Sequence, residues 1–483
     1  MSVLVSRKWL PITILGVISA LFYLLMQNYI AVVWYDEIGT SDTPINVVLY
    51  GKWDSEVWHY TYNPLHAFLL IPWLHIFGIS HASVCNLNII LSLVTFLILE
   101  HWMITKSYIT ERRSGVMLIL LLWMGFAISG LMTKGRIDML GMLLSVIMSR
   151  VIFWGRASAG HFISLFVAGF LLMMANMYVI PLIAFLMIFL WVINYRMEGR
   201  LLWFGRGVTV ALSFIASFLC ICYFYYQHHF VLHFLSSFFT FTDGVSTSSS
   251  FFVRVLKAYL AEPVSLLLIS LVWLSYFSSK CEKLDIRILA FVTAIPFLMC
   301  VAGRYQGYYV WLFSAPVLFI FTTTFDALST GKLKKIMLVL VIAQSFLRPA
   351  YWIYMRPQEY RQRHDVEHFI RESSPIIEKY ANVYFVNAIC YYAFVDAKMK
   401  IFFLNNDNLK VEKGLIQTLS ALSVFKNYEE DYPCGCLPDE GLAFNTSKDD
   451  ELRSKKYLDE NGFSYTLLKS NQQMSIYKFK RDI

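Results

Sequence analysis

The fold of this chain is decided by stretches such as WLPITILGVISALFYLLMQNYIAVVWYDE, residues 9–37. Its apolar residues continue for about 25 positions, and about 20 are enough to cross a bilayer. Arg7 and Lys8 precede this stretch, and the acidic pair Asp36-Glu37 ends it. We predict a retained membrane span over residues 9–34, because the apolar run is too long for the core of a cleaved signal peptide.

The whole composition points the same way. Hydrophobic residues make up 57% of the chain and charged residues 15%, whereas ordinary soluble domains carry about 25% charged residues. Only helices or closed barrels satisfy the backbone in lipid, and long apolar blocks favour helices over the short alternating strands of a barrel. We therefore predict a polytopic α-helical membrane protein. Ten further spans, eleven in all, are expected over 82–104, 115–132, 137–154, 161–178, 180–195, 207–226, 262–279, 286–302, 306–325 and 336–354.

The distribution of basic residues predicts the orientation. Residues 1–354 hold 23 basic and 14 acidic side chains, whereas the tail is close to neutral. With a cytoplasmic N-terminus, eleven spans place 16 basic residues inside and seven outside, as the positive-inside rule requires. The basic excess then reflects membrane topology, and no nucleic-acid partner is expected. The orientation depends on the turn near Pro181, because losing one span there would reverse all later ones.

Residues 355–483 are predicted to form a separate α/β domain outside the cytoplasm. Their charge is mixed, and their short runs of β-branched and aromatic residues are typical of strands. The expected strands lie within 381–389, 400–404, 463–468 and 474–479, and the expected helices within 358–380 and 449–460. Of the three cysteines in this tail, Cys390, Cys434 and Cys436, two can form one disulfide, and this pairing is left open.

Three polar clusters lie on the predicted outer side. The first is an outer loop over 35–80, in which 64–80 is expected to be a helix at the membrane interface. A carboxylate there can act as a general base, but a merely solvated loop fits the residue types equally well, and Glu37 can instead cap the following helix. The chemically interesting residues of this loop are Asp36, Glu37, Lys52, Asp54, His59 and Tyr62.

The second and third clusters combine cations with residues suited to the interface. Lys134 and Arg136 can hold a phosphate or simply extend to water, and Asp138 can cap or favourably charge a helix start. Arg304 next to Tyr305 suits a lipid phosphate, because a guanidinium makes bidentate bonds, but an aromatic belt explains the pair as well. His228, His229 and His233 lack a carboxylate at ligand spacing, so no metal site is predicted.

Taken in order, three short motifs resemble those of the GT-C glycosyltransferases, in particular the protein O-mannosyltransferases and the lipid A aminoarabinose transferases. The motifs are Asp36-Glu37, Tyr62-Asn63-Pro64-Leu65 and Arg136-Ile137-Asp138. The resemblance covers most of residues 1–354, and it departs from the family where Asn63 replaces the first proline of a usual double proline.

The resemblance implies transfer of a sugar from a polyprenyl-phosphate donor, with inversion at the anomeric carbon. It implies Asp36 as general base with Glu37 supporting it or binding the acceptor, no required metal, and a glycan, lipid or protein acceptor outside a bacterial inner membrane. Four cations would hold the donor phosphate, namely Arg304, Lys134, Arg136 and Lys52. Five residues would contact substrate, namely Asp138, Asp54, His59, Tyr62 and Tyr305.

Two other classes of protein are considered. A transporter or flippase for a lipid-linked precursor predicts ionisable residues at mid-membrane and two matching halves with broken helices, whereas the charges here gather at one interface. A non-enzymatic scaffold leaves the three outer clusters unexplained as a set. Nucleotide-binding fingerprints are absent from the sequence.

Overall fold

The computed structural model describes residues 8–30, 35–51, 53, 64–124, 135–153, 158–193, 200–229, 231, 232, 234, 235, 251–261, 263–279, 285–302, 311–328, 331–380, 383–386, 400–402 and 439–482. Most of them are helical. The membrane-type helices are α1 (Leu10–Ile30), α4 (His81–Thr105), α5 (Arg112–Met124), α7 (Asp138–Ile152), α8 (Ala159–Ala175), α9 (Ile180–Ile193), α10 (Arg200–Gln227), α13 (Pro263–Ser279), α14 (Ile286–Val301), α15 (Trp311–Ala327) and α16 (Lys332–Ile377). Three shorter ones are α2 (Tyr35–Tyr50), α3 (Pro64–Phe77) and α12 (Phe251–Leu260).

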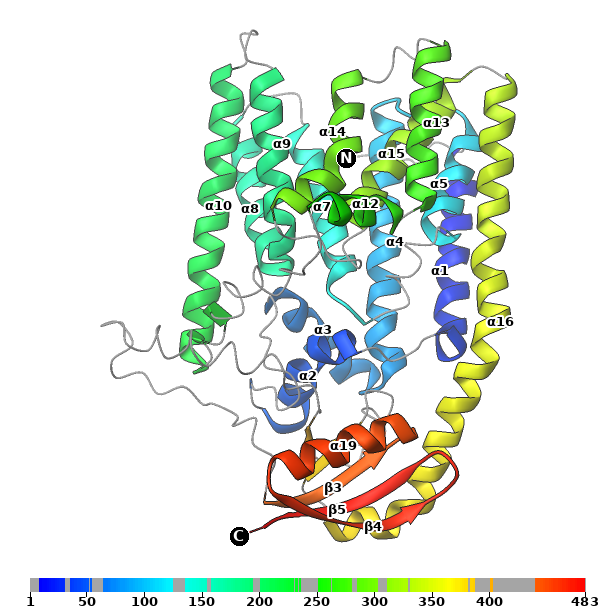
Figure 1. The fold of residues 1–483 in the computed structure, drawn as a ribbon. Coiled ribbons are helices and arrows are strands. Elements are labelled where there is room, and N and C mark those ends of the chain that lie inside the picture. Colours follow the sequence, from blue (N-terminus) through cyan, green and yellow to red (C-terminus); the bar gives the residue numbers. More distant parts are fainter. Residues whose placement is uncertain are drawn as a thin grey trace.

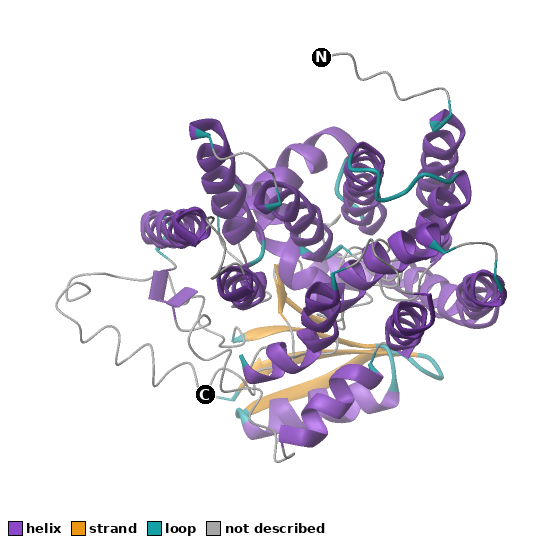
Figure 2. Cartoon of the chain, turned by 90° about the horizontal axis from the view of Figure 1, so that it is seen from above, coloured by secondary structure: helices purple, strands orange, loops and turns teal. Residues whose placement is uncertain are grey.

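The upright helices form a bundle with a small sheet domain at one end, which we call the sheet end (Figure 1). Helices α2 and α3 lie between the bundle and that domain, whereas α16 starts at the opposite, far end and runs down to the sheet (Figure 1). Viewed from above, the bundle helices appear nearly end-on with the strands beneath them (Figure 2). The first outer cluster and the C-terminal domain therefore share one end of the molecule.

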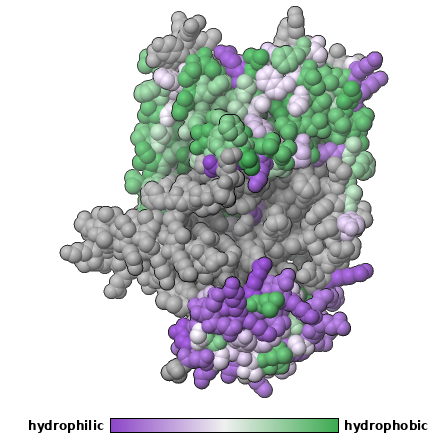
Figure 3. Space-filling model, viewed as in Figure 1, coloured by the Kyte–Doolittle hydropathy of each residue, from purple (hydrophilic) through white to green (hydrophobic). Residues whose placement is uncertain are grey.

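The surface of the bundle is that of a multi-pass membrane protein. Its helices are covered by apolar side chains, whereas the sheet domain is hydrophilic (Figure 3). By length and composition, His81–Thr105 and Leu201–Gln227 can each cross a membrane, and up to four crossings result if two bent helix pairs count as one span each. These figures cover only the described part of the chain, so the predicted total of eleven stays a prediction.

A sharp turn separates α8 from α9 at the place where we expected one near Pro181. The two helices are bent by 117° at the break, which is filled by the 3₁₀ turn η1 (Met177–Val179). Asn176 makes this turn, because its side-chain oxygen accepts a hydrogen bond from the backbone N–H of Tyr178 at 3.1 Å. Asn176 also packs tightly on Gly141 of α7, where even a methyl group would collide with its amide.

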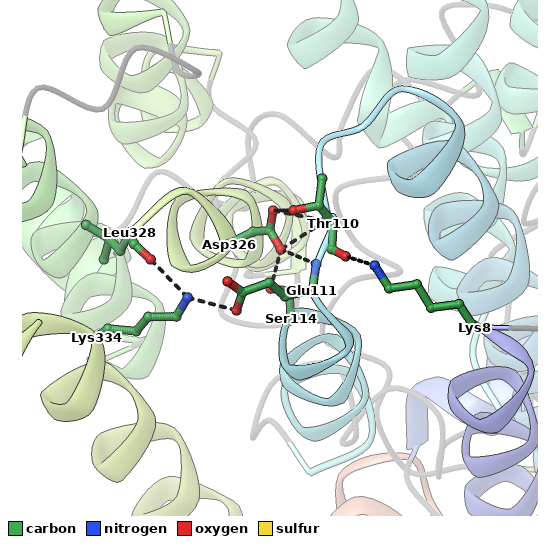
Figure 4. A network of polar contacts seen from close by, with 7 residues as sticks. All are labelled: Lys8, Thr110, Glu111, Ser114, Asp326, Leu328 and Lys334. Atoms are coloured by element: carbon green, nitrogen blue, oxygen red, sulfur yellow. Dashed lines mark hydrogen bonds and ion pairs between the residues drawn. The ribbon is translucent and has the colours of Figure 1, made fainter. Parts of the chain in front are cut away.

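At the far end, a polar network joins the starts and ends of four helices (Figure 4). The Asp326 carboxylate, at the end of α15, accepts hydrogen bonds from the backbone N–H groups of Thr110 and Glu111 and from the Ser114 hydroxyl, at 2.7–2.9 Å. It thereby satisfies N–H groups that the start of α5 leaves unpaired. Lys334 of α16 pairs with Glu111 at 3.0 Å, and the Lys8 ammonium donates to the Thr110 carbonyl at 2.6 Å.

The C-terminal sheet has five strands in the order β2-β1-β3-β5-β4. Strands β1 (Val383–Val386) and β2 (Lys400–Phe402) fall within the predicted segments, and β4 (Phe463–Ser470) and β5 (Ser475–Arg481) extend two residues beyond theirs. Strand β3 (Glu440–Asn445) was not anticipated. Helix α19 (Lys448–Glu460) covers one face through Leu458, and Phe369 of α16 packs on Phe444 on the other. The predicted α/β character of the tail is confirmed.

The boundary expected near residue 354 falls inside a helix. Helix α16 is continuous over 46 residues, so the predicted last span (336–354) and the predicted first helix of the tail (358–380) form one rod of about 69 Å. The short 3₁₀ turn η4 (Glu378–Tyr380) ends it. The sheet domain is therefore attached to the bundle by a helix rather than by a loop.

Tight packing of α1 on α4 gives a first prediction. A methyl group at Gly16 would collide with the ring of Phe96, which is fully buried. We expect Gly16→Ala to lower the free energy of unfolding by about 1–3 kcal/mol. Gly207→Ala in α10 is the matched control, because nothing lies within 4 Å of the added methyl, and it should stabilise the protein by about 0.5–1 kcal/mol. Equal melting temperatures for the two variants in detergent would contradict the packing of α1.

The sheet domain gives a second prediction, which concerns pH. A hydrogen bond from Lys455 lowers the pKa of the Glu451 carboxyl below its usual 4.5, and Tyr477 also donates to it at 2.5 Å. The stabilisation is complete above the unfolded pKa and is lost as the pH falls through the lowered folded pKa. Glu451→Gln should therefore lower the stability of the sheet by about 1–2 kcal/mol at pH 7. Amide hydrogen exchange in β5 should become faster by the corresponding factor, and the difference from the wild type should shrink below pH 4. A difference independent of pH would contradict this.

Candidate functional site

The acidic pair lies on a helix rather than in the expected loop. Because α2 begins at Tyr35, Asp36 and Glu37 occupy its first turn, where unpaired N–H groups favour negative charge. Whether Glu37 caps a helix, as one interpretation of the sequence proposed, stays a prediction. The side chains of both residues lie outside the described part of the structure, so their roles stay predictions.

A proline inside α2 explains how this helix is held. Pro44 has no N–H group, so the carbonyl of Thr40, four residues earlier, loses its helical donor. The ring of His66 supplies a replacement by hydrogen-bonding the Thr40 backbone. His66 is 2% exposed and lies in the first turn of α3, directly after Pro64-Leu65. The bond therefore joins α2, which begins with the first motif, to the residue that follows the second motif.

His66 is neutral at physiological pH. It lies in α3, outside the spans, and its burial between elements lowers the pKa of the imidazole to about 4, against a usual value of 6.5. A neutral imidazole carries one N–H donor. This single donor satisfies the Thr40 carbonyl. Because the imidazole is uncharged, His66 needs no counter-ion at this site.

The backbone at the third motif accepts two further hydrogen bonds, one at Arg136 and one at the preceding Gly135. The hydroxyl of Thr40 donates to the carbonyl of Gly135, and the Asn88 amide of α4 donates to the carbonyl of Arg136, both at 2.7 Å. Both donors are buried. Buried loop carbonyls need such partners, so segment 135–137 is fixed against α2 and α4. Thr40 therefore lies between the segments that carry the three motifs: it is in the helix of the acidic pair, and it bonds His66, which follows the second motif, and Gly135, which precedes the third.

Arg136 and Asp138 form a buried ion pair at the start of α7. Arg136 Nε lies 2.8 Å from Asp138 Oδ2, and Trp311 Nε1 of α15 donates to Asp138 Oδ1 at 3.2 Å. Asp138 has no exposed surface, and Arg136 is 8% exposed. Asp138 lies in the first helical turn, after the N-cap Ile137, and makes no cap bond. Of its two expected helix roles, only the favourable charge at the helix start is found.

The described structure thus locates two predicted site residues, Arg136 and Asp138, and brings them together. Asp36 and Glu37 are located only by their backbone in α2. The other predicted residues lie outside the described ranges, namely Lys52, Asp54, His59, Tyr62, Lys134, Arg304 and Tyr305. Sequence reasoning missed Thr40, His66, Asn88 and Trp311. Only one signal pointed to any of them, namely Pro44 inside a helix, four residues after Thr40.

An apolar cavity of about 360 Å³ lies next to this network. Its wall combines α4, α7, α9, α14 and α15. Trp311, which bonds Asp138, lines the cavity at the sheet end, and Thr323 of the same helix lines it nearer the far end. These residues are twelve positions apart, or about 18 Å along the helix. The cavity is therefore elongated along the bundle, with the buried ion pair beside one end.

The histidine-rich loop has a different surrounding. The ring of His228 lies tilted against two aromatic rings, with its centre 4.6 Å from that of Phe224 and 5.6 Å from that of Trp53. Burial, followed by the nearby His229, lowers the pKa of His228. Within the described ranges, no group of three potential metal ligands occurs. His233 lies outside them.

The helical bundle, the short helices at the sheet end and the C-terminal α/β domain together are similar in fold to solved GT-C membrane glycosyltransferases. The chain matches ArnT from Cupriavidus metallidurans bound to undecaprenyl phosphate, with a TM-score of 0.64 and 12% identity over 96% of this chain and 97% of that one. The apo state of the same protein gives a TM-score of 0.62. The resemblance inferred from the motifs is confirmed at the level of the fold.

A second solved protein shares the fold. The arabinofuranosyltransferase AftD from Mycobacteria matches with a TM-score of 0.53 and 10% identity, over 99% of this chain and 40% of that one. No protein-family model and no curated protein matches the sequence.

Proposed function

We propose that this protein is an integral membrane glycosyltransferase, which moves a sugar from a polyprenyl-phosphate donor to a cell-envelope glycan, lipid or protein, with inversion. The observation that carries the proposal is the hydrogen-bond network of Thr40, His66 and Asn88, which connects the segments that carry the three motifs. Undecaprenyl phosphate, the ligand in the ArnT structure of similar fold, supports a lipid-linked donor.

The reaction assigns a separate task to each group. The acceptor hydroxyl oxygen attacks the anomeric carbon, Asp36 takes the hydroxyl proton, and the bond from that carbon to the phosphate oxygen breaks. Glu37 supports the base or binds the acceptor. Negative charge grows on the departing phosphate, so preplaced cations lower the barrier. Arg304, Lys134, Arg136 and Lys52 are the proposed cations.

The buried ion pair suggests a more specific role for Asp138. Its distances to Arg136 and Trp311 are suited to holding the guanidinium in place, and substrate contact is then assigned to Asp54, His59, Tyr62 and Tyr305. Basic side chains can neutralise the phosphate without a metal, and no metal is required in this scheme.

The elongated cavity suits the prenyl chain of the donor. Its volume lies in the range of ligand pockets, and its apolar wall runs along the bundle from Trp311. A chain entering sideways between helices would then place its phosphate near Arg136. This arrangement accounts for a glycosyltransferase built largely of membrane helices.

The sheet end is assigned to the outside of a bacterial inner membrane, with a cytoplasmic N-terminus and eleven spans. Residues 1–354 would form the transferase domain and 355–483 a periplasmic domain. The basic residues of the far-end network, Lys8 and Lys334, support a cytoplasmic far end.

The test is transfer by the purified protein in vesicles. A labelled sugar on polyprenyl phosphate, offered with an envelope extract, should give a labelled product and free polyprenyl phosphate, whereas a nucleotide sugar should give none. Movement of the intact lipid-linked sugar across the vesicle membrane, without transfer, would instead favour a flippase. Absence of both activities would favour a scaffold.

A further inference from the structure

Helix α12 differs from the bundle helices in direction and length. Its axis is turned by 85° from that of α13, and it lies across the lower ends of α13 and α14, on the side facing the sheet domain (Figure 1). Its ten residues cover about 15 Å, half of what a crossing needs. The helix is therefore too short to cross a membrane by itself, and it runs nearly perpendicular to α13.

The two faces of α12 have different surroundings. Ala258 lies on a face that is buried, and Tyr259, at the border of that face, donates through its hydroxyl to the Thr293 carbonyl of α14 at 2.7 Å. On the other, Phe252, Leu256 and Leu260 are 81%, 59% and 57% exposed. Residues four apart share one helix face, so these three form a continuous apolar ridge. Such side chains are unfavourable in water, so the ridge favours an apolar surrounding.

The charges of α12 are all positive. Its basic residues are Arg254 and Lys257, and it contains no acidic residue. Arg254 Nε is buried and has no hydrogen-bond partner among the residues that the structure describes, while the guanidinium lies 6.0 Å from the Phe251 ring centre. A buried guanidinium N–H is costly without an acceptor, and the planar fork suits a phosphate.

We propose that α12 binds the membrane surface: the apolar ridge inserts between acyl chains, and Arg254 binds the phosphate of an anionic phospholipid. An apolar face combined with a basic one is the composition of helices that lie in the headgroup region. The inference does not depend on the transferase activity. In this proposal α12 anchors the bundle in one leaflet of the membrane, next to the outer ends of α14 and α15.

Photo-crosslinking tests the ridge. Benzoylphenylalanine in place of Phe252, in vesicles of phosphatidylcholine and phosphatidylglycerol, should give lipid adducts by mass spectrometry. The control is the same probe in place of Phe313, whose ring centre lies 6.1 Å from that of Tyr259 and which is 3% exposed. It should give at least tenfold fewer lipid adducts. Equal yields at the two positions would overturn the proposed insertion.

Native mass spectrometry tests the phosphate contact. Arg254→Gln should weaken phosphatidylglycerol binding about fivefold, the effect of one basic residue at an anionic surface, and Arg254→Lys should restore part of it. Lys456→Gln, in the sheet domain with a 76% exposed side chain, is the matched control and should change nothing. If Arg254→Gln kept phosphatidylglycerol binding and lost only polyprenyl phosphate, the phospholipid assignment would be wrong.

Discussion

Replacing Asp36 by asparagine is expected to lower the rate of sugar transfer by about 10²- to 10⁴-fold, the usual contribution of a general base. An amide cannot accept the proton of the acceptor hydroxyl, yet it has nearly the same size. The position at the start of α2 favours an ionised carboxylate. The measurement is the initial rate of product formation with saturating lipid-linked donor.

Glu37→Gln is the matched control, because it changes the adjacent acid in the same helical turn. A smaller loss, mainly in KM for the acceptor, is expected if Glu37 binds the acceptor. The melting temperature of both variants should stay close to that of the wild type. A folded Asp36→Asn protein with full activity would exclude Asp36 as the base, whereas a loss for Glu37→Gln alone would exchange the two roles.

The second large effect is expected at the buried ion pair. Asp138→Asn leaves the Arg136 guanidinium without the carboxylate at 2.8 Å, and removing one partner of a buried pair costs about 3–5 kcal/mol. The asparagine can still accept the hydrogen bond from Trp311, so the substitution removes only the negative charge that faces Arg136. Thermal unfolding in detergent should show a clearly lower melting temperature, together with weaker donor binding if Arg136 holds the phosphate.

The double variant Arg136→Gln/Asp138→Asn separates charge from packing. It removes both charges and should recover much of the stability lost in the single variant, because no unpaired charge remains. Donor binding should stay weak, since the cation is missing. Equal stability of Asp138→Asn and the wild type would show that the ion pair contributes little, and recovery of donor binding in the double variant would remove Arg136 from the phosphate site.

The sequence predicted the class of fold because the bilayer leaves few solutions. An apolar run of about 25 residues, as in 9–34, must be helical in lipid, and the structure confirms a helical bundle with a C-terminal α/β domain. Local patterns likewise located the four predicted strands and the break between α8 and α9. Helix and strand signals of this kind are short-range, so a single sequence contains them.

Long-range contacts could not be predicted in this way. The hydrogen bond from Thr40 to Gly135 joins residues 95 positions apart, and that from Trp311 to Asp138 joins residues 173 apart. Thr40, Asn88 and Trp311 are common residue types on apolar helices, and nothing local distinguishes them from packing residues. Strand β3 was missed for a related reason, because its pairing with β1 and β5 comes from distant segments.

By itself, the sequence determined that this is a membrane protein with an acidic pair at the end of its first apolar run and a basic segment at 134–136. Only the tertiary structure decided that Asp36 and Glu37 begin a helix. It also decided that Thr40 of this helix bonds His66 of α3 and the carbonyl of Gly135, next to Arg136. The physical reason is the proline at position 44. It leaves one carbonyl without a donor, and only a folded chain can bring His66 of another helix to satisfy it.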